Sequence, residues 1–249
     1  MRFEYKYFVP ADFLPMLRNM VCPFLGVDKN AAKAGGQYTV RSIYYETPDF
    51  EMYHTKQDGV AHRLKVRLRG YDVITDESTI FFEIKRKYEG PILKNRCQTN
   101  YGIAKKIIAG GDPDTLLEGN KRIDDSKRFM YQVFSRRMMP LVNVIYEREP
   151  YHGLFLDPEN DFRLTIDKNL RGVAYPKISE LGSETNAKYA NSGFAILEIK
   201  FNKYMPAWLK PVVAEGRLNK EPASKYVMCI DACKDINCNR MSEPLIKGR

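Results

Sequence analysis

The segment Arg63–Arg69 reads Arg-Leu-Lys-Val-Arg-Leu-Arg, so cationic and apolar residues alternate at every position. Side chains of a β-strand point alternately to the two faces of its sheet. As a strand, the segment places all its cations on one face, about 6.7 Å apart, and all its apolar residues on the other. The pattern therefore predicts a half-buried strand with one strongly cationic face.

Alternation of this kind recurs along most of the chain and predicts eight strands. They run over Arg2–Val9, Tyr38–Tyr45, His62–Arg69, Ile80–Lys87, Val142–Glu149, Phe162–Asp167, Leu170–Tyr175 and Phe194–Phe201. Capping signals predict a short helix from Thr47 to Gly59 and a helix over Tyr101–Ala109, and helical spacing predicts one over Asp125–Met138. Further helices are predicted over Trp208–Glu215 and Ser224–Cys233. Eight strands with helices outside them predict an α+β fold whose sheet can close into a barrel. Because no linker or repeat interrupts the chain, we expect a single domain over residues 1–249.

The polar faces of these strands carry far more Lys and Arg than Asp and Glu. One such row by itself is usually the solvated face of a half-buried sheet. Like charges aligned on several strands repel one another, however, and a bound anion would neutralise them. Guanidinium groups match phosphate oxygens bidentately. The formal net charge of +9 agrees with a polyanionic partner, namely nucleic acid, an anionic membrane surface or a phosphate-rich small molecule.

The few carboxylates on the cationic faces are candidate metal ligands. Phosphate chains are handled with Mg²⁺ or Mn²⁺, which take oxygen ligands and need only one or two carboxylates. Glu198 and Glu83 are the candidates, and ion pairing with neighbouring cations is an equal alternative for Glu83. The sequence contains no Walker-type glycine loop, and no spacing indicates a Ser/His/Asp or Cys/His nucleophile.

No apolar run approaches the ~18 residues that a membrane-spanning helix needs. The five cysteines are odd in number and are not spaced as in a zinc site. We expect them to be reduced thiols, and the protein to be cytoplasmic.

Eight segments that follow one another along nearly the whole chain together resemble a known family. They are Glu4–Tyr7, Ser42–Tyr45, Arg63–Arg69, Glu83–Lys87, Tyr146–Arg148, Arg163–Asp167, Leu197–Lys200 and Ser224–Tyr226. The set resembles the VTC domain, the polyphosphate polymerase domain of the vacuolar transporter chaperone complex and a member of the triphosphate tunnel metalloenzyme superfamily. The resemblance implies a closed antiparallel tunnel of eight strands, with a basic interior that binds phosphates.

The resemblance also implies an activity, which is transfer of the γ-phosphoryl group of ATP to a growing polyphosphate chain with Mn²⁺ or Mg²⁺. ATP and polyphosphate are the partners it implies. The phosphate- or ATP-binding cations would be Lys6, Arg63, Arg67, Arg69, Lys85, Lys94, Arg148 and Arg163. Arg63 is included because it lies on the same face of its predicted strand as Arg67 and Arg69. Glu198 matches the metal-binding glutamate, and Glu83 is the second metal candidate. Lys225 and Lys200 are the candidate catalytic residues, although Lys225 could equally be a helix-surface lysine.

Two alternatives remain open. Hydrolytic relatives typically begin with Glu-x-Glu-x-Lys, whereas this chain has Arg2-Phe3-Glu4-Tyr5-Lys6, so the first acidic position is basic. This departure disfavours a metal-dependent tripolyphosphatase or nucleoside triphosphatase of the same fold. A non-catalytic module for polyphosphate or nucleic acid is the other alternative. Because the cationic rows hold few aromatic residues for base stacking, no nucleic-acid partner is expected.

Overall fold

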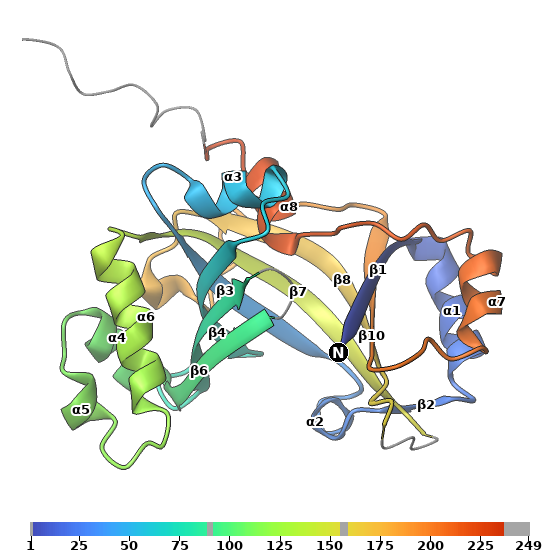
Figure 1. Cartoon of the computed structure of the whole chain (residues 1–249), viewed down its shortest axis with the longest axis horizontal. Helices are drawn as coiled ribbons and strands as arrows, with labels where there is room; N and C mark the ends of the chain where they lie inside the picture. The colour runs from blue at the N-terminus through green and yellow to red at the C-terminus, as the bar shows by residue number, and fades with distance from the viewer. Residues whose placement is uncertain (1, 89–91, 155–158, 237–249) are drawn as a thin grey trace, which may run out of the picture. The chain divides into compact units, whose positions relative to one another are not determined.

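The computed structural model describes residues 2–88, 92–154 and 159–236 (Figure 1). Its strands are β1 Phe3–Pro10, β2 Leu25–Val27, β3 Tyr38–Glu46, β4 Arg63–Tyr71, β5 Thr79–Lys87, β6 Ile92–Asn100, β7 Met139–Gly153, β8 Arg163–Ala174, β9 Lys188–Tyr189 and β10 Phe194–Phe201. Its α-helices are α1 Leu14–Val21, α2 Lys29–Ala32, α3 Glu51–Gln57, α4 Tyr101–Ile108, α5 Pro113–Leu116, α6 Ile123–Ser135, α7 Leu209–Glu215 and α8 Lys225–Ala232.

The strands form a large, mainly antiparallel sheet with flanking helices, which confirms the predicted α+β class. Hydrogen bonds connect the strands in the order β1-β10-β8-β7-β3-β4-β5-β6, and β2 and β9 pair with β7 and β8 beside this path. Over the described part of the chain the path ends at β1 and β6. The sheet is therefore not closed by hydrogen bonds, and the predicted closed barrel is not confirmed.

Tertiary contacts divide the chain into two compact units. The first consists of Met1–Thr39, Ile145–Arg171 and Tyr189–Met228, and the second of Val40–Val144, Gly172–Lys188 and Cys229–Arg249. The strands β3, β7, β8 and β9 contribute residues to both units. The single domain over residues 1–249 stays a prediction.

In the first unit, helices α1 and α7 pack side by side against one face of β1, β10 and β8 (Figure 1). Leu14, Leu17 and Val21 follow helical spacing and place one apolar stripe of α1 on the strands. Each fully buried aliphatic side chain of this core contributes about 1.5–3 kcal/mol. The strands supply the other half of the core through residues that include Val9, Leu164, Ile166, Leu197 and Ile199.

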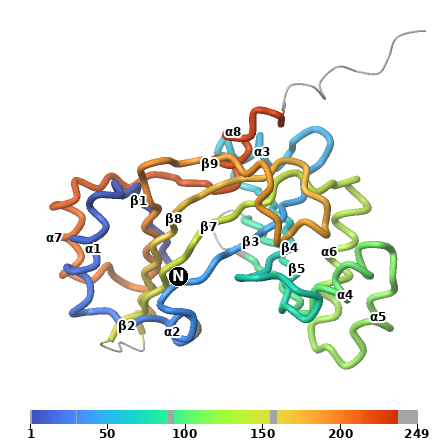
Figure 2. The backbone as a smooth tube through the Cα atoms, turned by 180° about the vertical axis from the view of Figure 1, so that it is seen from behind, coloured from blue at the N-terminus to red at the C-terminus, as the bar shows by residue number. Residues whose placement is uncertain are grey.

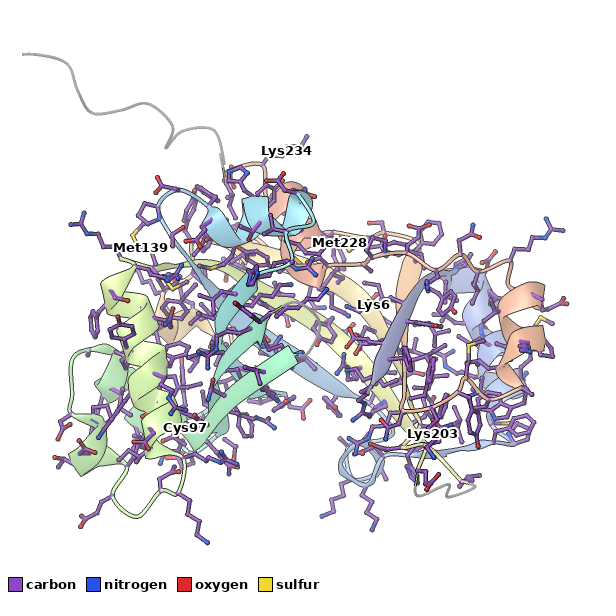
Figure 3. All side chains as sticks on the ribbon, viewed as in Figure 1. Lys6, Cys97, Met139, Lys203, Met228 and Lys234 are labelled. Atoms are coloured by element: carbon purple, nitrogen blue, oxygen red, sulfur yellow. The ribbon has the colours of Figure 1, made fainter. Side chains whose placement is uncertain are left out.

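The opposite face of the same strands carries the charges. Lys6 on β1 is paired in register with Glu198 on β10, and Glu198 with Thr165 on β8. Side chains of paired residues in antiparallel strands share a face, so the alternation confirms the polar rows predicted from the sequence. Lys6 is labelled on β1 in Figure 3. The next strand of the sheet after β8 is β7, and Figure 2 shows these two strands side by side.

In the second unit, β4, β5 and β6 pack their apolar face against α6, and α4 packs on β5 and β6 (Figure 2). The ring of Phe129 on α6 lies 4.8 Å from that of Phe82 on β5, and 5.4 Å from that of Tyr45 on β3. Cys97 of β6, labelled in Figure 3, is buried on this face. The cationic rows of β4 and β5 therefore lie on the other face of these strands.

Several elements were not predicted, and some predicted boundaries were wrong. The elements that were missed are the strands β2, β6 and β9 and the helices α1, α2 and α5. The two strands predicted over Phe162–Asp167 and Leu170–Tyr175 are one strand, β8, in which Asn169 has a positive φ of 52°. The helix predicted from Thr47 begins only at Glu51, because Glu46 and Thr47 accept hydrogen bonds from the backbone N–H groups that open α3.

Candidate functional site

Asp167 of β8 is the centre of a charged cluster in the first unit. Its side chain has no exposed surface. Arg148 of β7 donates to both carboxylate oxygens, from Nε at 2.6 Å and from Nη2 at 2.8 Å, and Nζ of Lys225 lies 2.7 Å from Oδ2. Burial alone would raise the pKa of Asp167, but Arg148 and Lys225 outweigh it and lower the pKa. Asp167 is therefore an ionised anchor for two cations.

Glu198 of β10 is the second buried carboxylate of this cluster, with a 7% exposed side chain. It pairs with Lys200 through Oε1, while Nζ of Lys6 and of Lys225 lie 3.8 and 3.9 Å from Oε2. Burial raises its pKa, but Lys225, Lys200 and Lys6 together bring that pKa well below its ordinary value. Both carboxylates in turn raise the pKa of Lys225 against the effect of its burial, so Lys225 is a cation near neutral pH.

The side chain of Lys225 is only 11% exposed, so it does not lie on the helix surface. Lys225 is the first residue of α8, and its Nζ lies 5.1 Å from the ring centroid of Tyr146. The guanidinium of Arg148 lies 5.3 Å from the same ring. Tyr146 thus supports both cations through cation–π contact.

Glu4 and Glu198 are the carboxylates of this cluster that fit a divalent metal. Lys6 and Lys200 each contact both of them, at 3.0 and 3.7 Å from Glu4. No group of three or more His, Cys, Asp or Glu side chains that could hold a metal occurs in the described residues. Mg²⁺ and Mn²⁺ accept one or two carboxylates when substrate phosphates supply further oxygens. The donor set therefore fits a metal that is bound jointly with phosphate.

Glu83 of β5 is the centre of a second cluster, in the second unit. Its 1% exposed side chain is surrounded by four cations. Arg67 Nε donates to Oε2 at 2.7 Å and Arg69 Nε lies 3.9 Å from Oε2, while Lys94 Nζ and Arg96 Nε lie 2.8 and 3.2 Å from Oε1. Burial raises the pKa of Glu83, but Arg67, Arg69 and Lys94 lower it far below its ordinary range. This geometry favours the ion-pairing alternative for Glu83.

Tyr44 of β3 is the phenol of the second cluster. Its hydroxyl oxygen accepts a 2.7 Å hydrogen bond from Nη1 of Arg67. Burial raises the pKa of Tyr44, but the surrounding cations Arg67, Lys65 and Arg69 lower it to about 7. A phenol with such a pKa reports a strongly positive local potential.

The structure brings most of the predicted site residues together, in two groups. The first unit joins Lys6, Arg148, Glu198, Lys200 and Lys225, and the second joins Arg67, Arg69, Glu83 and Lys94. Lys85 is paired with Lys94 on the cationic face, and Arg63 is paired with Lys87 near the start of β4. Arg163 is different, because its 60% exposed side chain pairs with Asp161 instead of a cluster carboxylate.

Five residues of these clusters were missed as site residues, namely Glu4, Tyr44, Arg96, Tyr146 and Asp167. Glu4, Tyr44, Tyr146 and Asp167 entered the sequence analysis only as members of predicted strands and of the segments that carry the resemblance, and Arg96 did not enter it. The spacing of Lys94 and Arg96 on alternate positions was the available signal for Arg96. For Asp167 no local signal exists, because its two cations come from distant segments.

A family model described as the VTC domain matches residues 1–234. The chain belongs to the VTC domain family. A curated relative is vacuolar transporter chaperone complex subunit 4 of Schizosaccharomyces pombe. It is 24% identical over an aligned stretch of 268 residues, gaps included, and the alignment covers 89% of this chain. The VTC domain described here spans only 36% of the length of that relative.

Among solved structures, this VTC domain is similar in fold to a putative adenylyl cyclase from Hippeastrum, which is described as having a dominant triphosphatase activity. The TM-score is 0.53 at 14% sequence identity, and the match covers 93% of this chain and 96% of the other. At this identity the likeness concerns the fold alone. No helix in the described ranges of the VTC domain is long and apolar enough to cross a membrane.

Proposed function

We propose that this VTC domain is an ATP-dependent polyphosphate polymerase, which transfers the γ-phosphoryl group of ATP to the end of a growing polyphosphate chain. The observation that carries the proposal is the cluster around Glu83. Four cations share this one buried carboxylate, and the register adds Lys65 and Lys85 to the same face. The surplus of positive charge is what a chain of phosphates would neutralise.

The two buried carboxylates explain how the cations would act. Glu83 and Asp167 hold Arg67 and Arg148 in place before any substrate arrives, so little reorganisation is needed when charge moves during the reaction. Phosphoryl transfer depends mainly on such positioning and charge stabilisation. We assign phosphate or ATP binding to Lys6, Arg63, Arg67, Arg69, Lys85, Lys94, Arg148 and Arg163.

We assign the catalytic role to Lys225 and Lys200. Both ammonium groups contact Glu198, and that of Lys225 is buried and kept protonated. A phosphate chain end is already anionic at neutral pH, so the transfer needs no general base. The lysines would instead stabilise negative charge on the phosphate oxygens.

Glu198 and its neighbour Glu4 would hold the divalent metal. When bound, Mg²⁺ or Mn²⁺ supplies positive charge to the phosphate oxygens. Glu83 was the second metal candidate, and its four cationic neighbours support a role in positioning Arg67 and Arg69 instead. ATP and polyphosphate as partners, and the closed tunnel, belong to the same proposal.

A cytoplasmic location is also part of this proposal. It is supported by the four cysteines in the described ranges, Cys22, Cys97, Cys229 and Cys233, which are all free thiols.

A tripolyphosphatase or nucleoside triphosphatase is the second candidate, and the exposure of Glu4 favours it. The Glu4 side chain is one-third exposed and lies beside Lys6 and Lys200. Water therefore reaches this part of the cluster, and attack by water in place of a phosphate chain end would release free phosphate.

Incubation with ATP and Mn²⁺, with and without a short polyphosphate primer, tests the proposal. We expect a ladder of polyphosphate on a gel only with metal, lost in Glu198→Ala and retained in Glu118→Ala, which alters an exposed glutamate. Free phosphate without a ladder would favour the hydrolase. Neither product, together with tight polyphosphate binding, would indicate a non-catalytic binding module.

A further inference from the structure

At one end of the cationic face of the second unit, aromatic and amide side chains follow the cations. On β5 the residue that follows Glu83 on this face is Phe81, and the register places Arg69 of β4 and Gln98 of β6 beside Phe81. On β4 the same row continues from Arg69 to Tyr71. An aromatic and amide end therefore adjoins the cationic cluster, about 6.7 Å away along the strands.

Arg96 connects the two ends. Its Nε lies 3.2 Å from Oε1 of Glu83, and its guanidinium carbon lies 3.5 Å from the centroid of the Phe81 ring. Tyr71 contacts both, because its hydroxyl accepts from Nη2 of Arg96 at 3.5 Å and its ring meets Phe81 edge to face at 6.0 Å. The guanidinium is thus fixed from two sides, while the Arg96 side chain remains 36% exposed.

A planar guanidinium that stacks on one ring offers a second flat face to another ring. Nucleobases stack on arginine planes and on aromatic rings. Beside Arg96, the exposed Gln98 carries an amide with both a donor and acceptors, which suits the edge of a base. A linear polyphosphate has no aromatic part and makes no use of this end.

We propose that Arg96, Phe81 and Gln98 form a subsite for the base of a nucleoside triphosphate, whose phosphates lie on the cations around Glu83. This inference rests on the proposed use of ATP and adds to it the orientation of the nucleotide. Two same-face steps, about 13 Å, separate the Phe81 position from Lys85, and the phosphate tail extends along this direction.

The test compares the affinities of a non-hydrolysable ATP analogue and of tripolyphosphate by calorimetry in the presence of Mg²⁺. We expect Phe81→Leu to weaken binding of the ATP analogue about tenfold and to leave that of tripolyphosphate within twofold, because only the nucleotide carries a base. Arg96→Lys keeps the charge but removes the flat surface, so we expect the same selective loss. The matched control is Phe134→Leu, which alters a 63% exposed phenylalanine on α6.

Equal losses for both ligands, or no loss for either, in both Phe81→Leu and Arg96→Lys would overturn the subsite. Arg96→Lys also decides the question if Phe81→Leu fails to fold. Polyphosphate synthesis by the wild type is measured separately. If the variants lose affinity for the ATP analogue selectively but the wild type makes no polyphosphate, the base subsite is supported and the polymerase proposal is contradicted. If the wild type makes polyphosphate but the variants show no selective loss, the polymerase proposal is supported and the base subsite is contradicted. A wild type that binds neither ligand contradicts both proposals.

Discussion

The ammonium of Lys225 lies 2.7 Å from Oδ2 of Asp167, and the same oxygen accepts a 2.8 Å hydrogen bond from Arg148. One buried oxygen therefore connects the first residue of α8 to the strands β7 and β8. A buried ion pair gives little net stability over an apolar packing, but removal of one partner leaves an uncompensated charge. Asp167 is thus needed for the position of both cations.

Asp167→Asn is expected to reduce the free energy of unfolding by about 3–5 kcal/mol, because two buried cations lose their shared counter-charge. Denaturant unfolding measures this change. The control is Asp161→Asn, because Asp161 is 44% exposed and also pairs with two arginines, Arg2 and Arg163. We expect a change within about 0.5 kcal/mol there. Similar losses in both variants would contradict the role of Asp167 as an anchor.

The sequence was sufficient for the strands whose alternation is complete. In Arg63–Arg69 every second residue is apolar, and this local pattern alone determines which residues share a face. The strand β6 was missed because its segment Leu93–Thr99 holds few apolar residues. It is a strand because it pairs with β5 along its length, for example Cys97 with Phe82, and such pairing is a tertiary property.

The contrast between local alternation and tertiary pairing also explains which parts of the site were predicted. The sequence correctly placed Lys6 and Glu198 on polar faces of their strands, because local periodicity determines the face on which a side chain lies. The sequence could not tell which carboxylate each cation would contact. Arg148 and Lys225 come from different elements and meet at Asp167 only after the strands pair and α8 packs. Ion-pair partners depend on the fold, and local residue types do not determine them.

Arg67→Ala is expected to lower the rate of polyphosphate synthesis about 10²–10³-fold, because one fixed cation would no longer stabilise the transferring phosphoryl group. The fold should persist, since Glu83 keeps Lys94 and Arg96 as partners. Arg86→Ala is the matched control, because Arg86 lies on the opposite face of β5 and is exposed. Synthesis is followed on stained gels. Wild-type rates in Arg67→Ala would exclude Arg67 from the site.

Tyr44 should ionise near pH 7, because the cations around it outweigh its burial and lower its pKa to about 7 from 10.0. Tyrosinate absorbance in the near ultraviolet should rise with a midpoint near pH 7 and lose this step in Tyr44→Phe. The phenolate is favoured in the folded state, so its contribution to stability is absent below about pH 7 and complete above pH 10. Added tripolyphosphate should raise the pKa of Tyr44 by neutralising the cations. A midpoint near pH 10 without ligand would refute the prediction.

Glu83→Gln separates the two roles that the sequence left open for this residue. As a counter-charge, Glu83 balances four cations, so the variant should lose about 3 kcal/mol of stability. Tripolyphosphate can replace the missing charge and should therefore raise the Tm of the variant more than that of the wild type. Glu51→Gln, which removes an exposed partner of Arg136, should change neither quantity. If Glu83 instead held the metal, the variant would lose the Tm shift caused by Mn²⁺ and would gain no additional shift from tripolyphosphate.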